Sequence, residues 1–158
     1  MENFINQDYM STSLTFKKNF INLIGNLEYT NTEIARSIGI DYGIYKKIIA
    51  YGQLPKPMVL TRIADYFDIS IDYLIGKTDD KYFEKANPPS NFITRYNELK
   101  QAYHYTDYKV AQKLHVSTSY TTAWKKHSYL PSLENLIILS EIFQVSLDYL
   151  LGRTNYKF

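Results

Sequence analysis

The chain contains no cysteine among its 158 residues, and it has only six glycines and five prolines. Without cysteine there is no disulfide framework, no thiolate nucleophile and no cysteine-ligated zinc site. No apolar run approaches the roughly 18 residues that a membrane-spanning helix needs, and the first residues lack the basic start of a secretory signal. These absences predict a cytoplasmic protein that does not interact with a membrane.

The composition is that of a folded protein with small, aromatic-rich cores. Hydrophobic residues make up 45% of the chain and aromatic residues 16%, with 16 tyrosines and eight phenylalanines. The formal net charge is only +2 and the isoelectric point is about 8.6, so the chain is less basic than many nucleic-acid-binding domains. Residues 1–78 hold eight basic and eight acidic side chains, and residues 79–158 hold ten and eight. A role in binding DNA therefore depends on where the basic residues lie.

A sequence repeat organises the chain. Displacing the sequence by 76 positions aligns residues 16–78 with residues 92–154 without a gap, and 15 of the 63 aligned pairs are identical. The strongest match pairs residues 70–78, SIDYLIGKT, with residues 146–154, SLDYLLGRT. Because solenoid proteins need about three or more repeats to cover their apolar faces, two copies predict two similar domains.

The segment between the two copies has the composition of a linker. It is polar and contains Pro88 and Pro89, which disfavour a helix and stiffen the chain. We therefore expect four segments: an N-terminal arm (1–13), a first domain (14–78), a linker (79–90) and a second domain (91–158).

Each copy has the apolar spacing and the capping residues of five short helices. Apolar residues at helical steps predict a first helix around Phe16 and its equivalent Phe92. Thr30 precedes Glu33 by three residues, the spacing of a capping box, and Gly39 is a stop signal. Further N-caps are predicted at Asp41, Ser70, Thr106, Ser117 and Ser146, with third helices near 42–50 and 118–127. We predict an all-α protein of two tandem five-helix domains.

The second and third helices of each copy, joined by a short turn, have the arrangement of a helix-turn-helix. The characteristic positions in the first copy are Thr30, Ile34-Ala35, Ile38 to Asp41, Pro55 and residues 69–76. Those in the second copy are Thr106, Val110-Ala111, Val116-Ser117, Trp124, Pro131-Ser132 and residues 145–152. On these residues each copy resembles the phage Cro/C1-type (XRE-like) repressor family. The resemblance implies that the third helix enters the major groove of DNA.

Both copies depart from the family at the ion pair that usually ties the first helix to the third. The first copy has Ile24 and Ile49 there, and packed apolar side chains can replace such a pair without loss of stability. The second copy has Lys100 and Lys125, whose like charges cannot pair with each other. We therefore expect one or both lysines to point to solvent or to phosphate oxygens.

The resemblance and helical geometry together predict the DNA contacts, because residues just after the cap of the third helix point away from the domain body. In the first copy these are Tyr42, Gly43, Lys46 and Lys47. In the second copy they are Thr118, Ser119, Thr122 and Ala123, followed by Lys125, Lys126 and His127 as backbone contacts. The second surface is the more convincing, because serine and threonine donate to base edges and small groups pack on thymine methyls. The family's phosphate-contacting glutamine is Asn31 in the first copy and Asp107 in the second, where a carboxylate would repel phosphate.

Catalytic and metal-binding chemistry is not indicated. Residues 76–78, Gly-Lys-Thr, match the end of a phosphate-binding loop, but the glycine required five residues earlier is Ile71. The three histidines lie 11 and 12 residues apart, without metal-ligand spacing, so surface or turn positions are expected for them. We expect no enzyme activity, no cofactor and no metal, and a core position for Trp124.

Two hypotheses of different classes follow. The first is a sequence-specific DNA-binding transcriptional regulator, a repressor of prophage or mobile-element type that occludes a promoter in double-stranded DNA. The alternative is a protein-binding module on the same scaffold, an antirepressor or an inhibitor of a host defence protein, which the low net charge and Asp107 favour. For Tyr42 in the first copy, the alternatives are contact with a DNA sugar and a place in an interface between the two domains. A mixed role, a regulatory protein partner and a homodimer are further alternatives, and two different DNA-contacting surfaces predict two unlike half-sites.

Overall fold

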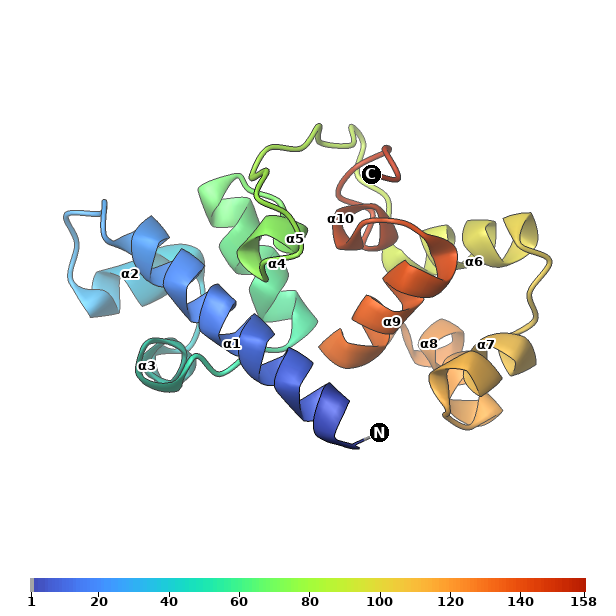
Figure 1. Cartoon of the computed structure of the whole chain (residues 1–158). Coiled ribbons are helices and arrows are strands. Elements are labelled where there is room, and N and C mark those ends of the chain that lie inside the picture. The colour runs from blue at the N-terminus through green and yellow to red at the C-terminus, as the bar shows by residue number, and fades with distance from the viewer. Residues whose placement is uncertain (1) are drawn as a thin grey trace. The chain divides into compact units, whose positions relative to one another are not determined.

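The structure, a computed structural model, describes residues 2–158, with side chains from Tyr9 onward. The chain divides into two compact units, unit 1 (Met1–Tyr82) and unit 2 (Phe83–Phe158). All regular elements in the described part are helices, which confirms the all-α prediction (Figure 1). Within residues 2–158 no helix is long and apolar enough to cross a membrane.

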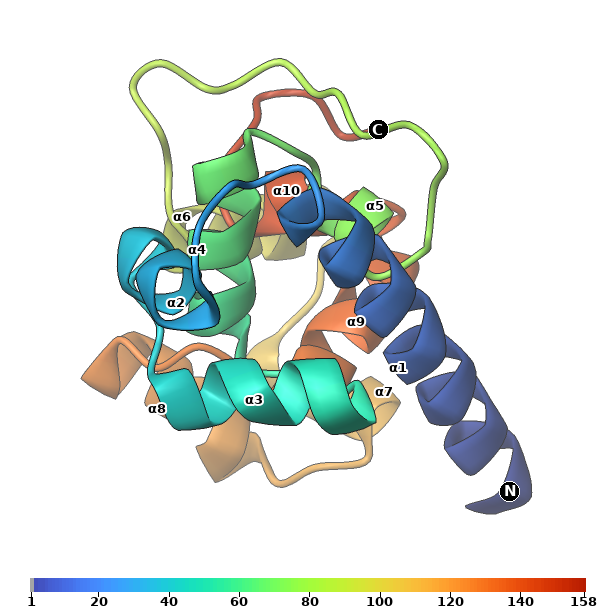
Figure 2. The ribbon, with the colours of Figure 1, turned by 90° about the vertical axis from the view of Figure 1, so that its left-hand side faces the viewer.

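Unit 1 contains five helices, with α1 packed against α3 and α5, and α4 packed against α2 and α5. Their bounds are α1 (Glu2–Ile24), α2 (Asn31–Ile38), α3 (Tyr42–Tyr51), α4 (Pro57–Phe67) and α5 (Ile71–Leu74). Phe16 and Phe20 of α1 are fully buried, together with Tyr45 of α3 and Leu60 of α4. Figure 2 shows α2 and α3 joined by a short turn, with α1 passing beside them.

Unit 2 contains the corresponding five helices, in which α7 packs against α8 and α9, and α10 packs against α6 and α9. Their bounds are α6 (Phe92–Ala102), α7 (Asp107–Leu114), α8 (Thr118–His127), α9 (Leu133–Phe143) and α10 (Leu147–Leu150). Trp124 is 1% exposed and contacts the rings of Phe92, Tyr96 and Tyr120. Its predicted core position is confirmed.

The helices of the two units correspond at the displacement of the sequence repeat. From the second helix of each unit onward, every start and end in unit 2 equals that in unit 1 plus 76. The correspondence continues after the last helix, because the Ser70 amide donates to Lys81 O at 2.9 Å and the Ser146 amide donates to Lys157 O at 2.6 Å. Residues 79–82, part of the expected linker, therefore make the contact that residues 155–158 make in unit 2.

The other part of the expected linker is bound to unit 2. The amide of Ala86 donates to Arg153 O at 2.8 Å, and the amide of Ser90 donates to Gly152 O at 2.9 Å. Gly152 has φ 78°, and a Cβ there would lie 2.3 Å from the Ser90 carbonyl carbon. Only glycine allows this approach, so the segment before α6 packs directly on the turn after α10.

Local capping signals account for most helix starts. Thr30 and Glu33 form both hydrogen bonds of a capping box, and Asp41 accepts hydrogen bonds from two amides of α3. The predicted caps at Ser70, Thr106 and Ser146 also accept backbone hydrogen bonds. Ser117 stands at the predicted N-cap position but makes no side-chain cap hydrogen bond, and its Oγ lies 3.0 Å from Ser119 Oγ. Ser117 is therefore the N-cap residue, as predicted, but its side chain does not accept a hydrogen bond from an amide of α8.

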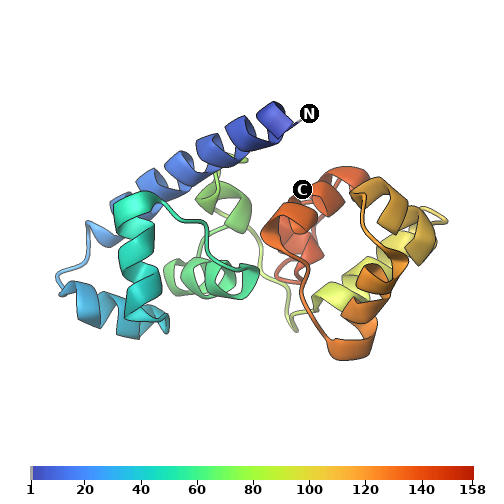
Figure 3. The same ribbon diagram turned by 90° about the horizontal axis from the view of Figure 1, so that it is seen from below.

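Helix α1 is much longer than its counterpart α6. It begins at Glu2, so the described part of the expected arm, residues 2–13, is helical, while Met1 lies outside the described residues. In Figure 3 its N-terminal turns continue past α3. Residues 2–15 contain neither proline nor glycine, whereas the equivalent part of unit 2 contains Pro88 and Pro89, which cannot continue a helix. The two units therefore differ most at their N-terminal ends.

Candidate nucleic-acid interface

The turn between α7 and α8 sets the direction of α8. His115 ends α7 with φ 55°, in the left-handed region, and its amide donates to the carbonyls of Ala111 and Gln112. Gly39 has the same role in unit 1, at φ 78°. A histidine pays a steric cost in this conformation that glycine avoids. All three histidines are exposed, and His104 and His115 occupy turn positions with positive φ, as expected for surface residues.

The predicted contact residues of unit 2 lie on the outer side of α8. Ser119 and Thr122 are exposed, whereas Thr118 and Ala123 are half-buried. The hydroxyl of Thr122 is 3.1 Å from the carbonyl oxygens of both Thr118 and Ser119, so in the free protein it donates to its own helix. The last turn carries Lys125, Lys126 and His127, all exposed. The helix thus presents hydroxyls in its first half and cations at its end.

The predicted contact residues of unit 1 are also exposed, and their surface is more aromatic. Tyr42 stacks on Tyr45 with ring centroids 6.1 Å apart, and Lys46 Nζ lies 5.7 Å from the centre of the Tyr42 ring. Lys47 is exposed on the same helix. A Cβ on Gly43 would lie 2.8 Å from Asp41 Oδ1, the oxygen that caps α3. Glycine at position 43 therefore leaves room for the Asp41 oxygen that caps α3.

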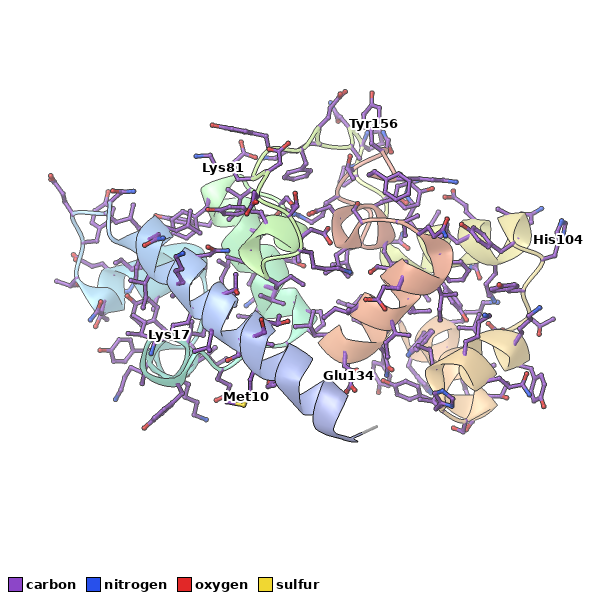
Figure 4. The ribbon with its side chains drawn as sticks, viewed as in Figure 1. Met10, Lys17, Lys81, His104, Glu134 and Tyr156 are labelled. Carbon is purple, nitrogen blue, oxygen red and sulfur yellow. The ribbon has the colours of Figure 1, made fainter. Side chains whose placement is uncertain are left out.

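The C-terminal end of α3 is attached to α1. The Ser13 hydroxyl donates to Gly52 O at 2.5 Å, and Lys17 Nζ donates to Ala50 O at 2.9 Å. Figure 4 shows Lys17 beside α3. A Cβ on Gly52 would lie 2.9 Å from Ser13 O, so the two backbones approach closely. This contact was not predicted from the sequence, because Ser13 falls in the expected N-terminal arm (1–13).

An ionic cluster joins α6, α7 and α8 in unit 2. Asp107 Oδ1 accepts hydrogen bonds from Lys100 Nζ and, at 3.0 Å, from the Tyr96 hydroxyl. Asp107 Oδ2 lies 3.6 Å from Lys125 Nζ. Lys100 therefore does not point to solvent, whereas Lys125 has a side chain that is 43% exposed, so the expectation of solvent exposure holds for one of the two lysines. The anion that pairs with Lys100 is Asp107. From the sequence, Asp107 was singled out only because it stands where the family has a glutamine that contacts phosphate.

The pKa values of the cluster respond to its burial and its charges. Burial raises the pKa of Asp107, but the hydrogen bond and the charge of Lys100 outweigh that effect and hold this pKa below its ordinary value. Burial lowers the pKa of Lys100, against the opposing effect of Asp107. Burial, with the charge of Asp107, raises the pKa of Tyr96, which therefore stays a hydrogen-bond donor. The lowered pKa keeps the carboxylate of Asp107 ionised at neutral pH.

The equivalent cluster in unit 1 is neutral. Ile24 and Ile49 are half-buried at the positions of the two lysines, in agreement with the expected apolar replacement. Asn31 Oδ1 accepts a hydrogen bond from the Tyr45 hydroxyl at 2.8 Å. The tyrosine donor therefore comes from α3 in unit 1 and from α6 in unit 2. The sequence signal for this exchange is the aligned pairs Phe20/Tyr96 and Tyr45/Thr121, where each unit has its tyrosine at a different position.

Comparison with known proteins identifies the second unit. The sequence profile of a family described as helix-turn-helix matches residues 97–150. An uncharacterized HTH-type transcriptional regulator of Bacillus subtilis (strain 168), YobD, is 31% identical over 64 residues, which cover 40% of this chain and 57% of the relative. The chain thus spans a little over half the length of that relative, and no solved structure was found to match. Residues 97–150, from the middle of α6 to the end of α10, form a domain of the helix-turn-helix family.

Proposed function

We propose that the protein is a sequence-specific DNA-binding transcriptional regulator, a repressor of phage or mobile-element type that acts by occluding a promoter. The observation that carries the proposal is the exposed side of α8 within the segment that matches the helix-turn-helix family. In this arrangement the first helix of the motif, α7 in unit 2, lies across the DNA backbone and the second, α8, enters the major groove.

In unit 2 the base contacts are assigned to Thr118, Ser119, Thr122 and Ala123, and the backbone contacts to Lys125 and Lys126. Hydroxyls can donate to or accept from several base edges, and the Ala123 methyl suits a thymine methyl group. The lysines supply the attraction to phosphate that makes affinity depend on salt. Because Thr122 donates to its own helix in the free protein, its hydroxyl must turn to donate to a base.

Unit 1 is proposed to be a second DNA-binding domain, with Tyr42, Gly43, Lys46 and Lys47 at its surface. From the second helix onward, each helix of unit 1 begins and ends 76 residues before its counterpart in unit 2. Lysine favours guanine edges, whereas the hydroxyls of α8 fit several bases. One chain therefore binds an operator made of two unlike half-sites.

Protein binding is the second candidate function, and one observation favours it for unit 1. Tyr42 and Tyr51, at the two ends of α3, are 43% and 78% exposed. Tyrosine is enriched at the centres of protein interfaces, where its ring supplies contact area at a low cost in entropy. In this mixed role unit 2 binds DNA and unit 1 binds a regulatory protein or a second copy of the chain.

Selection of bound sequences from a pool of random duplexes tests the proposal. We expect an enriched site with two unlike halves, and an affinity whose logarithm falls with the logarithm of the salt concentration by about 0.9 per phosphate contact. Lys46→Glu with Lys47→Glu should change the preference for one half only. A palindromic site would indicate a homodimer that uses one unit per half-site, and a lack of enrichment would contradict the proposal.

A matched pair of variants separates specific contacts from net charge. Lys125→Glu with Lys126→Glu should weaken binding by about tenfold or more, because two phosphate contacts become repulsive. Lys81→Glu with Lys157→Glu makes the same change in net charge outside α8, at side chains that are also exposed. This control should weaken binding by only about twofold, because salt screens distant charges. Equal losses of DNA affinity in the two variants would show that α8 is not part of the DNA interface.

A further inference from the structure

The two lysines beside Asp107 are held in different ways. Lys100 has a side chain that is 9% exposed and donates directly to Oδ1. Lys125 has a side chain that is 43% exposed, and its Nζ lies 3.6 Å from Oδ2, beyond the usual length of a hydrogen bond. The first contact is a buried ion pair. The second is a loose ion pair at the surface, and such pairs contribute little to stability.

Lys125 projects from a side of α8 that is close to the predicted DNA contacts. It follows Thr122 by three residues and Thr118 by seven, so the three side chains lie along one flank of the helix. On the same flank Thr121 Oγ1 lies 3.3 Å from the carbonyl oxygen of Asp107, the first residue of α7. When Thr118 and Thr122 approach base edges, Lys125 is therefore brought near the DNA phosphate backbone that lies beside the N-terminal end of α7.

We propose that Asp107 is an internal stand-in for a DNA phosphate: it holds Lys125 in the free protein and yields it to a backbone phosphate when unit 2 binds DNA. The inference rests on the proposed function of unit 2. It makes Asp107 a residue that sets affinity by competition, in addition to its structural contact with Lys100.

The charges of the cluster make the transfer of Lys125 favourable. Asp107 keeps Lys100 and the Tyr96 hydroxyl on Oδ1 when Lys125 leaves, so its charge stays compensated. Without Lys100, a bare carboxylate at the start of α7 would repel the phosphate. The contact that is lost is a loose surface pair, whereas each new contact between lysine and phosphate releases a condensed counterion from DNA.

Unit 1 has no equivalent of this device. Its corresponding residues are Ile24, Asn31 and Ile49, none of which carries a charge. The competition is therefore a property of unit 2, and the residues of unit 1 provide a template for an uncharged control.

A double-mutant cycle on the affinity for the selected duplex tests the competition. Lys125→Met should weaken binding about fivefold in the natural background, because one phosphate contact is lost. In the Asp107→Asn background the same substitution should cost about tenfold, because no carboxylate then competes for Lys125. Asp107→Asn alone should tighten binding. If Lys125 only supports the position of α8 through Asp107, its substitution will cost nothing once Asp107 is gone, and the proposal is overturned.

Two controls keep the cycle interpretable. Lys126→Met removes the neighbouring cation, which makes no contact with Asp107 among the described residues, so its cost should be the same in both backgrounds. An equal cost of Lys125→Met in both backgrounds would likewise overturn the proposal. Because Asp107→Asn leaves Lys100 buried without an anion, the cycle is repeated in a background of Lys100→Ile with Asp107→Asn, which copies Ile24 and Asn31. There too Lys125→Met should cost more than in the natural chain.

Carbon-13 NMR of the Asp107 carboxyl group separates the failure of this inference from the failure of the proposed function. In the free protein, Lys125→Met should shift this resonance and Lys126→Met should not. Addition of the selected duplex, or of a random duplex at low salt, should move the natural protein toward the Lys125→Met position. A duplex that binds without moving the resonance overturns the transfer alone. If no duplex binds, the proposed function fails and the transfer with it, while the free-protein spectra still show whether Asp107 holds Lys125.

Discussion

In unit 1 the first three helices meet at neutral side chains, whereas in unit 2 the same positions carry two lysines and an aspartate. Tyr45 donates to Asn31 between α3 and α2, and Tyr96 donates to Asp107 between α6 and α7. The first residue of the second helix accepts a tyrosine hydroxyl in both units, although the tyrosine comes from different helices. In both units the polar group at that position has a hydrogen-bond partner, as buried polar groups generally do, whereas its charge differs between the units.

The two units also differ in how the ends of the third helix are held. Helix α3 has an aspartate N-cap and a glycine C-cap, Gly52, and its C-terminal end receives two side-chain hydrogen bonds from α1. Helix α8 has Ser117 as its N-cap, without a side-chain cap hydrogen bond, and Ser128 as its C-cap, with φ 53°. Local unfolding begins where few such bonds exist, so we expect the ends of α8 to open more readily than those of α3.

The largest expected effect concerns the buried residue at equivalent positions of the third helices. Trp124 and Ile48 are each 1% exposed. Trp124→Ala should lower the free energy of unfolding by about 3–5 kcal/mol, because it removes a large ring from the core of unit 2. Ile48→Ala should cost less, about 2–4 kcal/mol. Urea denaturation followed by circular dichroism measures both, and a smaller loss for Trp124→Ala would contradict the comparison.

A charge placed in the neutral cluster of unit 1 should have the next largest effect. Ile24→Lys should destabilise the protein by about 1–3 kcal/mol, because a half-buried ammonium group would face Asn31. Adding Asn31→Asp should recover part of that loss, since it rebuilds the pair that Lys100 and Asp107 form. Ile21→Lys, at a position of the same helix that is 39% exposed, is the matched control and should be nearly neutral. No recovery in the double variant would show that the two clusters are not interchangeable.

The attachment of α1 to α3 is expected to contribute less. Ser13→Ala removes the donor to Gly52 O and should cost about 1 kcal/mol. Ser11→Ala, at an exposed position in the same part of α1, should change the free energy of unfolding by less than about 0.5 kcal/mol. Hydrogen exchange should show faster opening at the end of α3 in the first variant only. The same rate in both variants would mean that this bond does not secure α3.

The smallest expected effect is at the turn between the second and third helices of each unit. His115→Gly should stabilise unit 2 by about 0.5 kcal/mol, because glycine adopts the positive φ without steric cost. Gly39→His should destabilise unit 1 by about 1 kcal/mol for the same reason. In thermal unfolding, the midpoint temperature should rise for His115→Gly and fall for Gly39→His. Destabilisation by His115→Gly would show that the imidazole ring has a role in the turn.

Much of the fold could be predicted from local patterns. The N-caps at Thr30 and Asp41, the stop at Gly39 and the bounds of the third helices depend on residues within one turn of each other, and the structure agrees with all of them. The sequence repeat predicted that the same helices would occur twice, and the helix bounds follow the displacement of 76 residues. The length of α1 was missed, because no cap or proline marks its start and the repeat begins only at Phe16.

The candidate site was predicted less completely. Exposure of Ser119, Thr122, Lys46 and Lys47 follows from helical periodicity, and the structure places all four at the surface. Their contacts with DNA stay predictions. The position of Lys100 could not be predicted from spacing, because its partner Asp107 lies on the next helix and the two side chains meet only in the folded domain.

The sequence by itself determined most of the helix bounds, apart from the start of α1, since caps, glycine stops and apolar periodicity act through neighbouring residues. It also predicted the recurrence of the helix bounds at a displacement of 76 residues. The tertiary structure decided which charges are compensated: Lys100, Asp107 and Lys125 come from three helices and meet only after those helices pack. An ion pair depends on distance in space, and residues on different helices acquire that distance only in the folded domain.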